Sequence, residues 1–466
     1  MLRISYPRTT PLLCKFRLFA LALFTVSGLA VSAKADDWPQ WLGPKRDGVW
    51  RETGILEKFP KEGPKVRWRT PIGMGYAGPA VAEGRVYVFD RVLSPDAKNP
   101  DNPFSKNKIA GKERILCLNE KDGSEIWKHE YDCSYEISYA SGPRTAPSIV
   151  DGKVYTLGAM GDLLCLDAKD GKPVWSKNLP REYDSGVPMW GFSASPLIDG
   201  DKLITLVGGP DHVVMAFNKN SGKEIWHALS ANEIGYCPPV IVEAGGKRQL
   251  IIWHPESVNS LDPETGKPYW SEKLLVKAGM TIPMPRLEDN KLFMTGFYCG
   301  SMMLKLDSDQ PTEQLMWKEK GKSEYPKDTK ALHAVMSTPY FKDGYIYGVC
   351  SYGQLRCLKA DTGERVWETL KATGAKDEPV ERWANAFLIP NGDRFFIPNE
   401  KGDLIIAKLT PKGYEEISRA HILEPTGNTG GFGGNRPILW SHPAFANKSM
   451  YARNDKEIVC VSLAEK

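Results

Sequence analysis

The sequence predicts an all-β protein, an eight-bladed β-propeller with four-stranded antiparallel blades, and three observations support this fold. An apolar run that leads through a glycine turn to a tryptophan recurs along the chain of 466 residues. The tryptophans from Trp127 to Trp367 stand 48, 51, 44, 47 and 50 residues apart, a period typical of propeller blades. Between them lie β-branched and aromatic segments separated by Gly, Asp and Asn turns, the pattern of short antiparallel strands.

Each copy of the motif places a tryptophan at the same point of a blade. A glycine such as Gly123 precedes it and supplies the positive φ that a tight turn requires. We interpret these tryptophans as packing between neighbouring blades, because a residue repeated around a ring cannot form one asymmetric ligand site. The set comprises Trp68, Trp127, Trp175, Trp226, Trp270, Trp317 and Trp367.

The strand that follows each blade's first turn can be counted eight times along the chain. The landmarks are Val86, Val154, Leu203, Leu250, Leu292, Ile346, Phe395 and Met450. The sequence after the last landmark is too short for a complete eighth blade, whereas residues 66–70 form a strand that has no blade of its own. We therefore predict that this N-terminal strand closes the last blade by pairing with residues 457–463, which leaves no open edge in the ring.

The first 35 residues are predicted to be a signal peptide. Basic residues precede an apolar run over residues 18–31, and Ala33-Lys-Ala35 forms a cleavage signal. The run is too short for a membrane span, and Cys14 precedes it, so no lipid-attachment site is expected. The prediction is a periplasmic or secreted protein with an N-terminal extension at 36–65 and the propeller at 66–466.

Charge and cysteine content exclude several classes of function. Without residues 1–35 the chain has 56 basic and 57 acidic residues, so no excess of charge favours nucleic acid or an anionic membrane. Four of the remaining cysteines occupy one equivalent strand position in different blades, and the other four leave one disulfide possible but not deducible. No metal-ligating pattern and no haem-attachment motif is found, and we expect a monomer.

Three further segments resemble binding motifs or interrupt the repeat pattern. Residues 73–78 match a dinucleotide-binding fingerprint in letters, but Pro79 and a strand follow where a helix would be needed. The glycine-rich residues 430–434 lack the Lys-Ser/Thr of a phosphate loop and are expected to form a flexible connection. Residues 91–114 interrupt the first blade with a polar insertion that we expect to be a solvated loop.

The residues just before each blade's innermost strand ring the mouth of a propeller's central channel. In this chain many of these positions hold aromatic, arginine and histidine side chains, which would form a binding site where they converge. The alternative is that they fill the channel or hydrogen-bond the strand ends. The candidates are Tyr76, Arg144, Trp190, Tyr236, Arg286, His333, Trp383, Trp440 and His442.

The tryptophan repeats resemble those of the quinoproteins, the superfamily of eight-bladed pyrroloquinoline quinone (PQQ) propellers. Residues 261–270 are close to an ideal copy, and residues 37–48 are similar to the opening of exported PQQ-like repeat proteins of planctomycete-type bacteria. The superfamily also includes BamB-like propellers of the outer-membrane β-barrel assembly machinery. For its alcohol dehydrogenases the resemblance implies PQQ held between a Trp and a vicinal disulfide, with Ca²⁺ on Glu, Asn and Asp. This chain has no adjacent cysteines and no matching calcium set.

Two functions remain open at this stage. The first is a non-catalytic exported binding or scaffold module that holds a protein or glycan partner at the funnel, without a cofactor. The second is a PQQ- and Ca²⁺-dependent alcohol or sugar dehydrogenase. The absence of a recognisable catalytic set favours the first, because function must be argued from a site and a fold alone does not define it.

Overall fold

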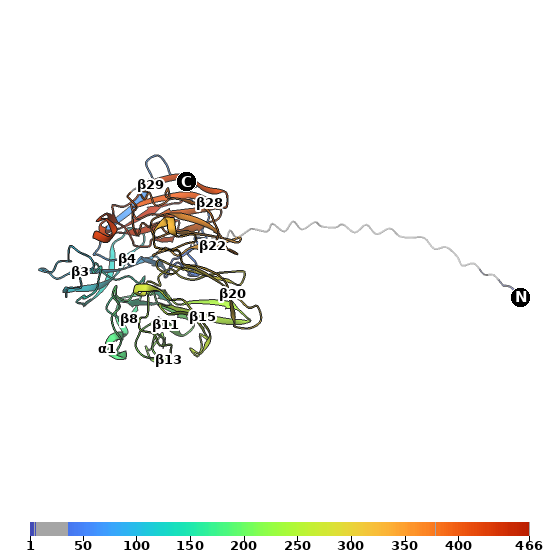
Figure 1. Ribbon diagram of the computed structural model, residues 1–466, viewed down its shortest axis with the longest axis horizontal. Coiled ribbons are helices and arrows are strands. Elements are labelled where there is room, and N and C mark those ends of the chain that lie inside the picture. Colours follow the sequence, from blue (N-terminus) through green and yellow to red (C-terminus); the bar gives the residue numbers. More distant parts are fainter. Residues whose placement is uncertain (4, 6–35, 378, 466) are drawn as a thin grey trace. The chain divides into compact units, whose positions relative to one another are not determined.

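The computed structural model describes residues 1–3, 5, 36–377 and 379–465. The predicted signal peptide lies outside the described residues except for residues 1–3 and 5. Residues 36–465 belong to one compact unit (Figure 1), in which the strands form eight four-stranded sheets and one two-stranded ribbon. The all-β, eight-bladed fold predicted from the repeats is therefore confirmed.

Every blade is an antiparallel sheet, and in the first seven the strands run in chain order from the innermost to the outermost. The first four blades comprise β2 (Ala80–Ala82), β3 (Arg85–Leu93), β4 (Gly111–Asn119) and β5 (Glu125–Asp132); β6 (Ser148–Val150), β7 (Lys153–Leu157), β8 (Asp162–Asp167) and β9 (Pro173–Asn178); β10 (Leu197–Asp199), β11 (Lys202–Leu206), β12 (Val214–Asn218) and β13 (Glu224–Ala228); and β14 (Val240–Ala244), β15 (Lys247–His254), β16 (Ser257–Leu261) and β17 (Pro268–Lys273).

The next three blades and the connections follow the same order. The blades comprise β18 (Arg286–Glu288), β19 (Lys291–Gly296), β20 (Gly300–Leu306) and β21 (Glu313–Glu319); β22 (Tyr340–Lys342), β23 (Tyr345–Val349), β24 (Leu355–Lys359) and β25 (Arg365–Thr369); and β26 (Ile389–Asn391), β27 (Arg394–Pro398), β28 (Asp403–Thr410) and β29 (Gly413–His421). The connections hold helix α1 (Leu179–Tyr183), 3₁₀ turns at Lys277–Gly279, Pro326–Asp328 and Gly431–Gly433, and a ribbon of β30 (Gly427–Asn428) and β31 (Pro437–Ile438).

The eighth blade joins the two ends of the propeller sequence. It contains β32 (Ala444–Ala446), β33 (Ser449–Arg453), β34 (Glu457–Ser462) and, as its outermost strand, β1 (Val66–Pro71). In the β1–β34 pairing, Trp68 stands opposite Cys460 and Thr70 opposite Ile458. Because β2 packs beside both β6 and β32, the first blade contacts the second and the eighth, and the ring is closed. The predicted closure by the N-terminal strand is confirmed.

Position in the blade explains the pattern of burial along the strands. Middle strands such as β8 are apolar at successive positions, because neighbouring blades cover both of their faces. Outermost strands such as β5 instead alternate between exposed and more buried residues, since only one face packs inward.

The motif tryptophans lie on outermost strands and reach the adjacent blade. Trp127 Nε1 donates a hydrogen bond of 3.0 Å to the carbonyl oxygen of Ala168 in the second blade. Gly171 adjoins this ring, and a Cβ at that position would stand 2.5 Å from Trp127 Cε3, so the turn must be glycine. Equivalent bonds to the next blade are made by Trp68, Trp175, Trp226, Trp317 and Trp367.

Trp270 differs from the other six. Its Nε1 donates to Gln249 Oε1 at 2.9 Å within its own blade. The turn between β20 and β21 in the next blade, residues 307–312, contains no glycine. That turn lacks a glycine like those packed against the rings of Trp68, Trp127, Trp175, Trp226 and Trp317, whereas Trp367 bonds to Thr410 with no glycine against its ring.

Candidate functional site

A cavity of about 550 Å³ forms where the segments that lead into the innermost strands converge. All eight blades contribute to its wall, from Tyr76 before β2 to His442 before β32. The lining consists mainly of aromatic and aliphatic side chains. It comprises Trp41, Tyr76, Phe104, Tyr139, Arg144, Met189, Trp190, Ser193, Ser195, Tyr236, Pro238, Ala278, Met280, Ile282, Tyr298, Val335, Met336, Arg382, Trp383, Phe387, Phe432, Trp440 and His442.

The structure brings together most of the funnel residues that the sequence singled out. Those that line the cavity are Tyr76, Arg144, Trp190, Tyr236, Trp383, Trp440 and His442. His333 does not line it: the ring is 1% exposed, with Nε2 3.3 Å from Glu319 Oε2 and Nδ1 3.4 Å from the Phe297 carbonyl oxygen. Arg286 also lies outside the lining and donates to the carbonyl oxygens of Pro339 and Arg46.

One side of the cavity comes from residues 38–48 of the N-terminal extension. Trp38 exchanges backbone hydrogen bonds with Val81 of β2, and the Pro39 carbonyl accepts from Ile149 of β6. Trp41 lines the cavity, where its indole stands 5.0 Å from the His442 ring and donates to Met284 Sδ. This segment therefore lies against the innermost strands of the first two blades and adds Trp41 to the cavity wall.

Arg46 fixes the extension to the third and fourth blades. Its guanidinium is buried and donates to the carbonyl oxygens of Pro196 at 3.0 Å, Ser195 at 3.4 Å and Pro239 at 3.3 Å. Burial lowers the pKa of Arg46 to about 10, so the side chain stays charged at neutral pH. Sequence reasoning left the extension without a role, although its cluster of Trp38, Trp41 and Trp50 was a signal of burial.

Two loops bring further aromatic rings to the mouth of the cavity. Phe104, in the insertion of the first blade, stands 5.1 Å from Tyr139, 6.0 Å from Trp383 and 5.3 Å from Phe432. Phe432 lies in the glycine-rich turn Gly431–Gly433 and is 68% exposed. The expected solvated loop is confirmed in exposed residues such as Asp96 and Lys98, but β3 and β4 extend into the insertion and Phe104 packs at the cavity.

The two arginines of the lining already have protein partners. Arg144 donates to the carbonyl oxygens of Gly142, Ser138 and Tyr139 and stacks on the Tyr76 ring at 5.2 Å. Burial lowers its pKa below the usual arginine value. Arg382 pairs with Glu324 at 2.8 Å and lies over the Trp383 ring at 4.7 Å. The Nη groups of Arg144 and Nη2 of Arg382 are engaged within the protein, whereas Arg382 Nε is buried without a partner.

The titratable groups at the cavity are held neutral or paired. Burial lowers the pKa of His442 to about 4, and its Nδ1 stands 2.7 Å from the Pro443 carbonyl oxygen, so the imidazole is neutral with Nε2 as its acceptor. Behind the wall, Glu400 accepts from Trp440 Nε1 at 3.0 Å and pairs with Arg436 at 2.8 Å. Burial raises the pKa of Glu400 to about 7.

Three residues of the lining have left-handed backbone conformations that side chains rarely adopt. Tyr139 has φ 55°, Ala278 has φ 55° and Trp383 has φ 63°. Each such residue costs about 1–3 kcal/mol and persists where the surrounding structure holds it, most often at functional sites. The Trp383 amide donates to the Ser351 carbonyl oxygen at 2.6 Å, which holds this ring in the wall.

The lining does not fit PQQ with Ca²⁺. Calcium takes about six to eight oxygen ligands, mainly from carboxylates and amides. None of the described residues around the cavity is Asp, Glu, Asn or Gln, and none is cysteine. Glu400, which contacts Trp440, is already paired with Arg436. The quinone's carboxylates would also need cationic donors, and those of Arg144 are bound to carbonyl oxygens.

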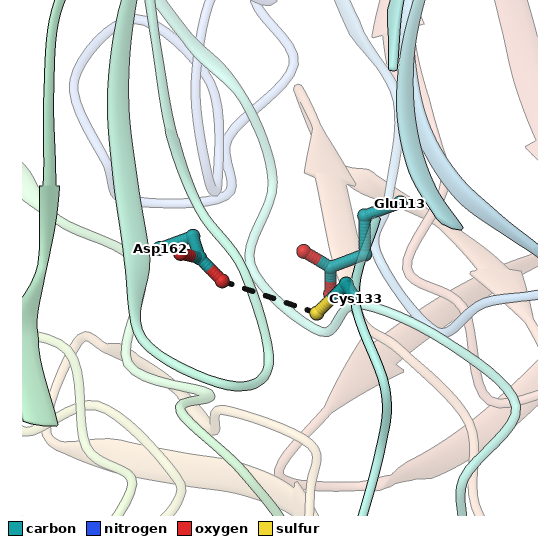
Figure 2. Close-up of side chains that lie close together, drawn as sticks. All are labelled: Glu113, Cys133 and Asp162. Carbon is teal, nitrogen blue, oxygen red and sulfur yellow. Dashed lines mark hydrogen bonds between the residues drawn. The ribbon is translucent and has the colours of Figure 1, made fainter. Parts of the chain in front are cut away.

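A separate cluster lies between the first and second blades, outside the cavity (Figure 2). Donor atoms of Glu113, Cys133 and Asp162 fall within 4.8 Å of one another, and Cys133 Sγ donates to Asp162 Oδ2. Glu113 also accepts from the hydroxyls of Tyr131 and Tyr135 and from the Ala159 amide. Burial raises the pKa of the Cys133 thiol, so it is protonated and a poor cation ligand. We interpret this cluster as a buried hydrogen-bond network.

Comparisons with known proteins agree with the architecture. A family model described as outer membrane protein assembly factor BamB matches residues 111–369 and 256–466. BamB from Moraxella catarrhalis is similar in structure, with a TM-score of 0.53 and 16% identity over 85% of this chain and 97% of that protein. A europium-containing methanol dehydrogenase gives a TM-score of 0.56 and 13% identity over 91% of this chain and 89% of that enzyme.

Two negative findings complete the comparison. No curated protein sequence matches the chain. Within the described residues, no helix has the length and apolar character needed to cross a membrane. At these identities the structural similarities show the fold and leave the activity to be argued from the cavity.

Proposed function

Because this chain belongs to the PQQ-like propeller family whose model describes the outer membrane protein assembly factor BamB, we propose that it is an exported, non-catalytic binding module. In this proposal the axial cavity holds a group presented by a partner. The family model describes an assembly factor, and a methanol dehydrogenase is similar in structure. Membership of the family therefore does not by itself choose between binding and catalysis.

The composition of the cavity lining carries the proposal. A concave apolar site of about 550 Å³ has the size of a ligand pocket. Catalysis by general acid or base would need a titratable group in the lining with a pKa near the working pH. His442 is neutral over the physiological range, and the described lining contains no carboxylate. Ligand binding is the function that such a surface supports best.

Binding at the cavity can be tested with the aromatic, singly anionic dye anilinonaphthalenesulfonate and the full-length protein. We expect one dye site per chain, with fluorescence that falls at least fivefold in Met336→Trp, because the larger ring fills the cavity. Leu315→Trp, on the outer strand β21 and 45% exposed, is the matched control and should leave dye binding unchanged. Equal binding by the two variants would place the dye elsewhere and remove this support.

The dehydrogenase alternative is tested by reconstitution with PQQ and Ca²⁺. We expect no dye reduction with alcohols or sugars, because the described lining offers no carboxylate for the cation. Turnover that depends on both PQQ and Ca²⁺ would overturn the binding proposal.

Export is tested by the N-terminus of the protein recovered from cells. We expect it to begin at Asp36, in the periplasm or the medium. Such a cut precedes the first residues fixed in the fold, since Trp38 already pairs with Val81. A cytoplasmic chain that retains residues 1–35 would contradict the proposed location.

A further inference from the structure

We infer that the group held in the cavity is an aromatic side chain of a partner polypeptide. This inference rests on the proposed binding function and specifies its ligand. It follows from the hydrogen-bonding groups of the lining, because a buried ligand must find partners there for its own polar atoms.

The hydroxyl groups of the cavity are largely engaged within the protein. Tyr139 donates to the Thr429 carbonyl oxygen at 2.7 Å, and Ser193 to that of Gly191 at 3.2 Å. Ser195 accepts from the Ala146 amide at 3.3 Å. Tyr139 and Ser193 therefore donate within the protein, whereas Ser195 and Tyr236 act only as acceptors in the bonds that they form.

Several nitrogen donors of the lining are engaged in the same way. Trp41 donates to Met284 Sδ, Trp440 to Glu400, and Arg382 Nη2 to Glu324 at 2.9 Å. Trp383 Nε1 and Arg382 Nε have no hydrogen-bond partner but are buried within the wall. The indole nitrogen of Trp190 and Nε2 of His442 also have no partner among the described residues. The cavity thus offers a ligand few polar groups within a mainly apolar wall.

This inventory discriminates between classes of ligand. A sugar ring carries a hydroxyl on most of its carbons, and burial here would leave most of them unpaired. A multiply charged anion would find its cations already bound to carbonyl oxygens and to Glu324. An aromatic ring instead stacks on Trp190 and Trp383 and contacts the sulfur of Met336. Only one or two polar atoms of the ligand need a partner.

The surroundings of the mouth indicate that the ring belongs to a chain. Met189 and Phe432 line the cavity and are 44% and 68% exposed, so the apolar surface continues outward from the opening. They come from opposite parts of the ring, before the third blade and before the eighth. A polypeptide that inserts one aromatic residue covers the exposed parts of both side chains with its flanking residues, whereas a small molecule held inside the cavity leaves those parts in water.

The experiment uses immobilised hexapeptide pools, each with one fixed and five random positions, and the full-length protein. We expect retention on pools with fixed Trp, Phe or Tyr to exceed that on pools with fixed Ser or Asp at least tenfold. Immobilised hexasaccharides of glucose, xylose and N-acetylglucosamine should not retain the protein. Trp190→Ala should reduce retention on the aromatic pools at least fivefold, whereas Tyr269→Ala on the outer strand β17 should not change it.

Melting temperatures of the variants show that folding is retained, and Met336→Asn provides a second cavity substitution should Trp190→Ala fail to fold. Stronger retention on sugars than on peptides would overturn the ligand class. Loss of that sugar retention in Trp190→Ala would still support binding at the cavity. Aromatic-pool retention that is unchanged by both cavity substitutions would overturn the inference, as would free N-acetyltryptophanamide that binds as tightly as the peptides. Quinone-dependent turnover would overturn the proposed function itself.

Discussion

At the scale of single residues, two populations of tryptophan differ in what they contact. Those on outermost strands rest on a turn of the adjacent blade, as Trp127 does at 8% exposure. Trp383 belongs to the cavity wall, is half-buried and has its backbone in a strained conformation. The first population holds the ring of blades together, whereas the second shapes a surface. Substitution should therefore affect different measurements in the two cases.

We predict that Trp127→Ala lowers the free energy of unfolding by about 3–5 kcal/mol, the range for truncation of a buried aromatic side chain. Trp383→Ala should cost less than about 2 kcal/mol, because its side chain is already partly exposed to water. Trp175 occupies the same position in the repeat as Trp127 but is half-buried. The cost of Trp175→Ala should therefore lie between the costs of the other two substitutions. Urea denaturation followed by circular dichroism measures all three, and equal costs would contradict the distinction.

Glu400 links stability to pH. Its folded-state pKa of about 7 lies above the ordinary value of 4.5, so the folded protein holds this proton more tightly than the unfolded chain. Its stabilising contribution is therefore complete below pH 4.5 and is lost as pH rises through 7. Between pH 5 and pH 8 we expect the wild type to lose about 1–3 kcal/mol more than Glu400→Gln. Parallel pH profiles of the two proteins would contradict this assignment.

At the scale of elements, the N-terminal extension is the segment whose role differs most from its appearance in the sequence. It has few regular strands of its own, yet Trp38, Leu42 and Trp50 are buried and Arg46 is bonded to two blades. It belongs to the core of the molecule and also adds Trp41 to the cavity wall.

We predict that Arg46→Leu lowers the free energy of unfolding by about 3 kcal/mol or more, because three buried carbonyl oxygens lose a charged donor. Arg46→Lys should recover part of the loss, since an ammonium group can still donate. Lys45→Leu, at the exposed neighbouring position, is the control and should change stability little. Thermal unfolding of the three variants tests this, and a neutral Arg46→Leu would mean that the extension is not anchored there.

Sequence reasoning predicted the elements that repeat and missed those that occur once. The blades were readable because each Gly–Trp pair is local and recurs, and the residues before the innermost strands pointed to the cavity. Trp41, Phe104 and Phe432 were missed, since each reaches the cavity through a segment without a counterpart in other blades. His333 occupies an equivalent position in sequence, but its contact with Glu319 turns the ring away. The direction in which a side chain points depends on its neighbours in three dimensions, which the sequence period does not reveal.

At the scale of the whole molecule, the ring depends on one pairing between distant segments. β34 lies between β33 and β1, so it joins the last blade's own hairpin to the N-terminal strand. Contacts so distant in sequence form late, because loop closure must precede them.

We predict that a chain ending at residue 456 loses the cooperative fold, because β1 then has no partner and the eighth blade retains two strands. A chain beginning at residue 36 is the control and should unfold as the full-length protein does. Size-exclusion chromatography and the sharpness of thermal unfolding distinguish the outcomes. A cooperative transition in the shortened chain would show that seven blades suffice.

The N-terminal segment at the cavity has a kinetic consequence. Because residues 38–48 bond to the first four blades and place Trp41 in the cavity wall, we expect a ligand to enter and leave at the opposite opening, beside Phe432. One bound ligand would then block the next until it dissociates. Residence time then depends on the rings at the entrance, Phe104 and Phe432, which stand 5.3 Å apart. The depth of the cavity determines how much of a ligand is buried, and the rings at its mouth determine how slowly the ligand dissociates.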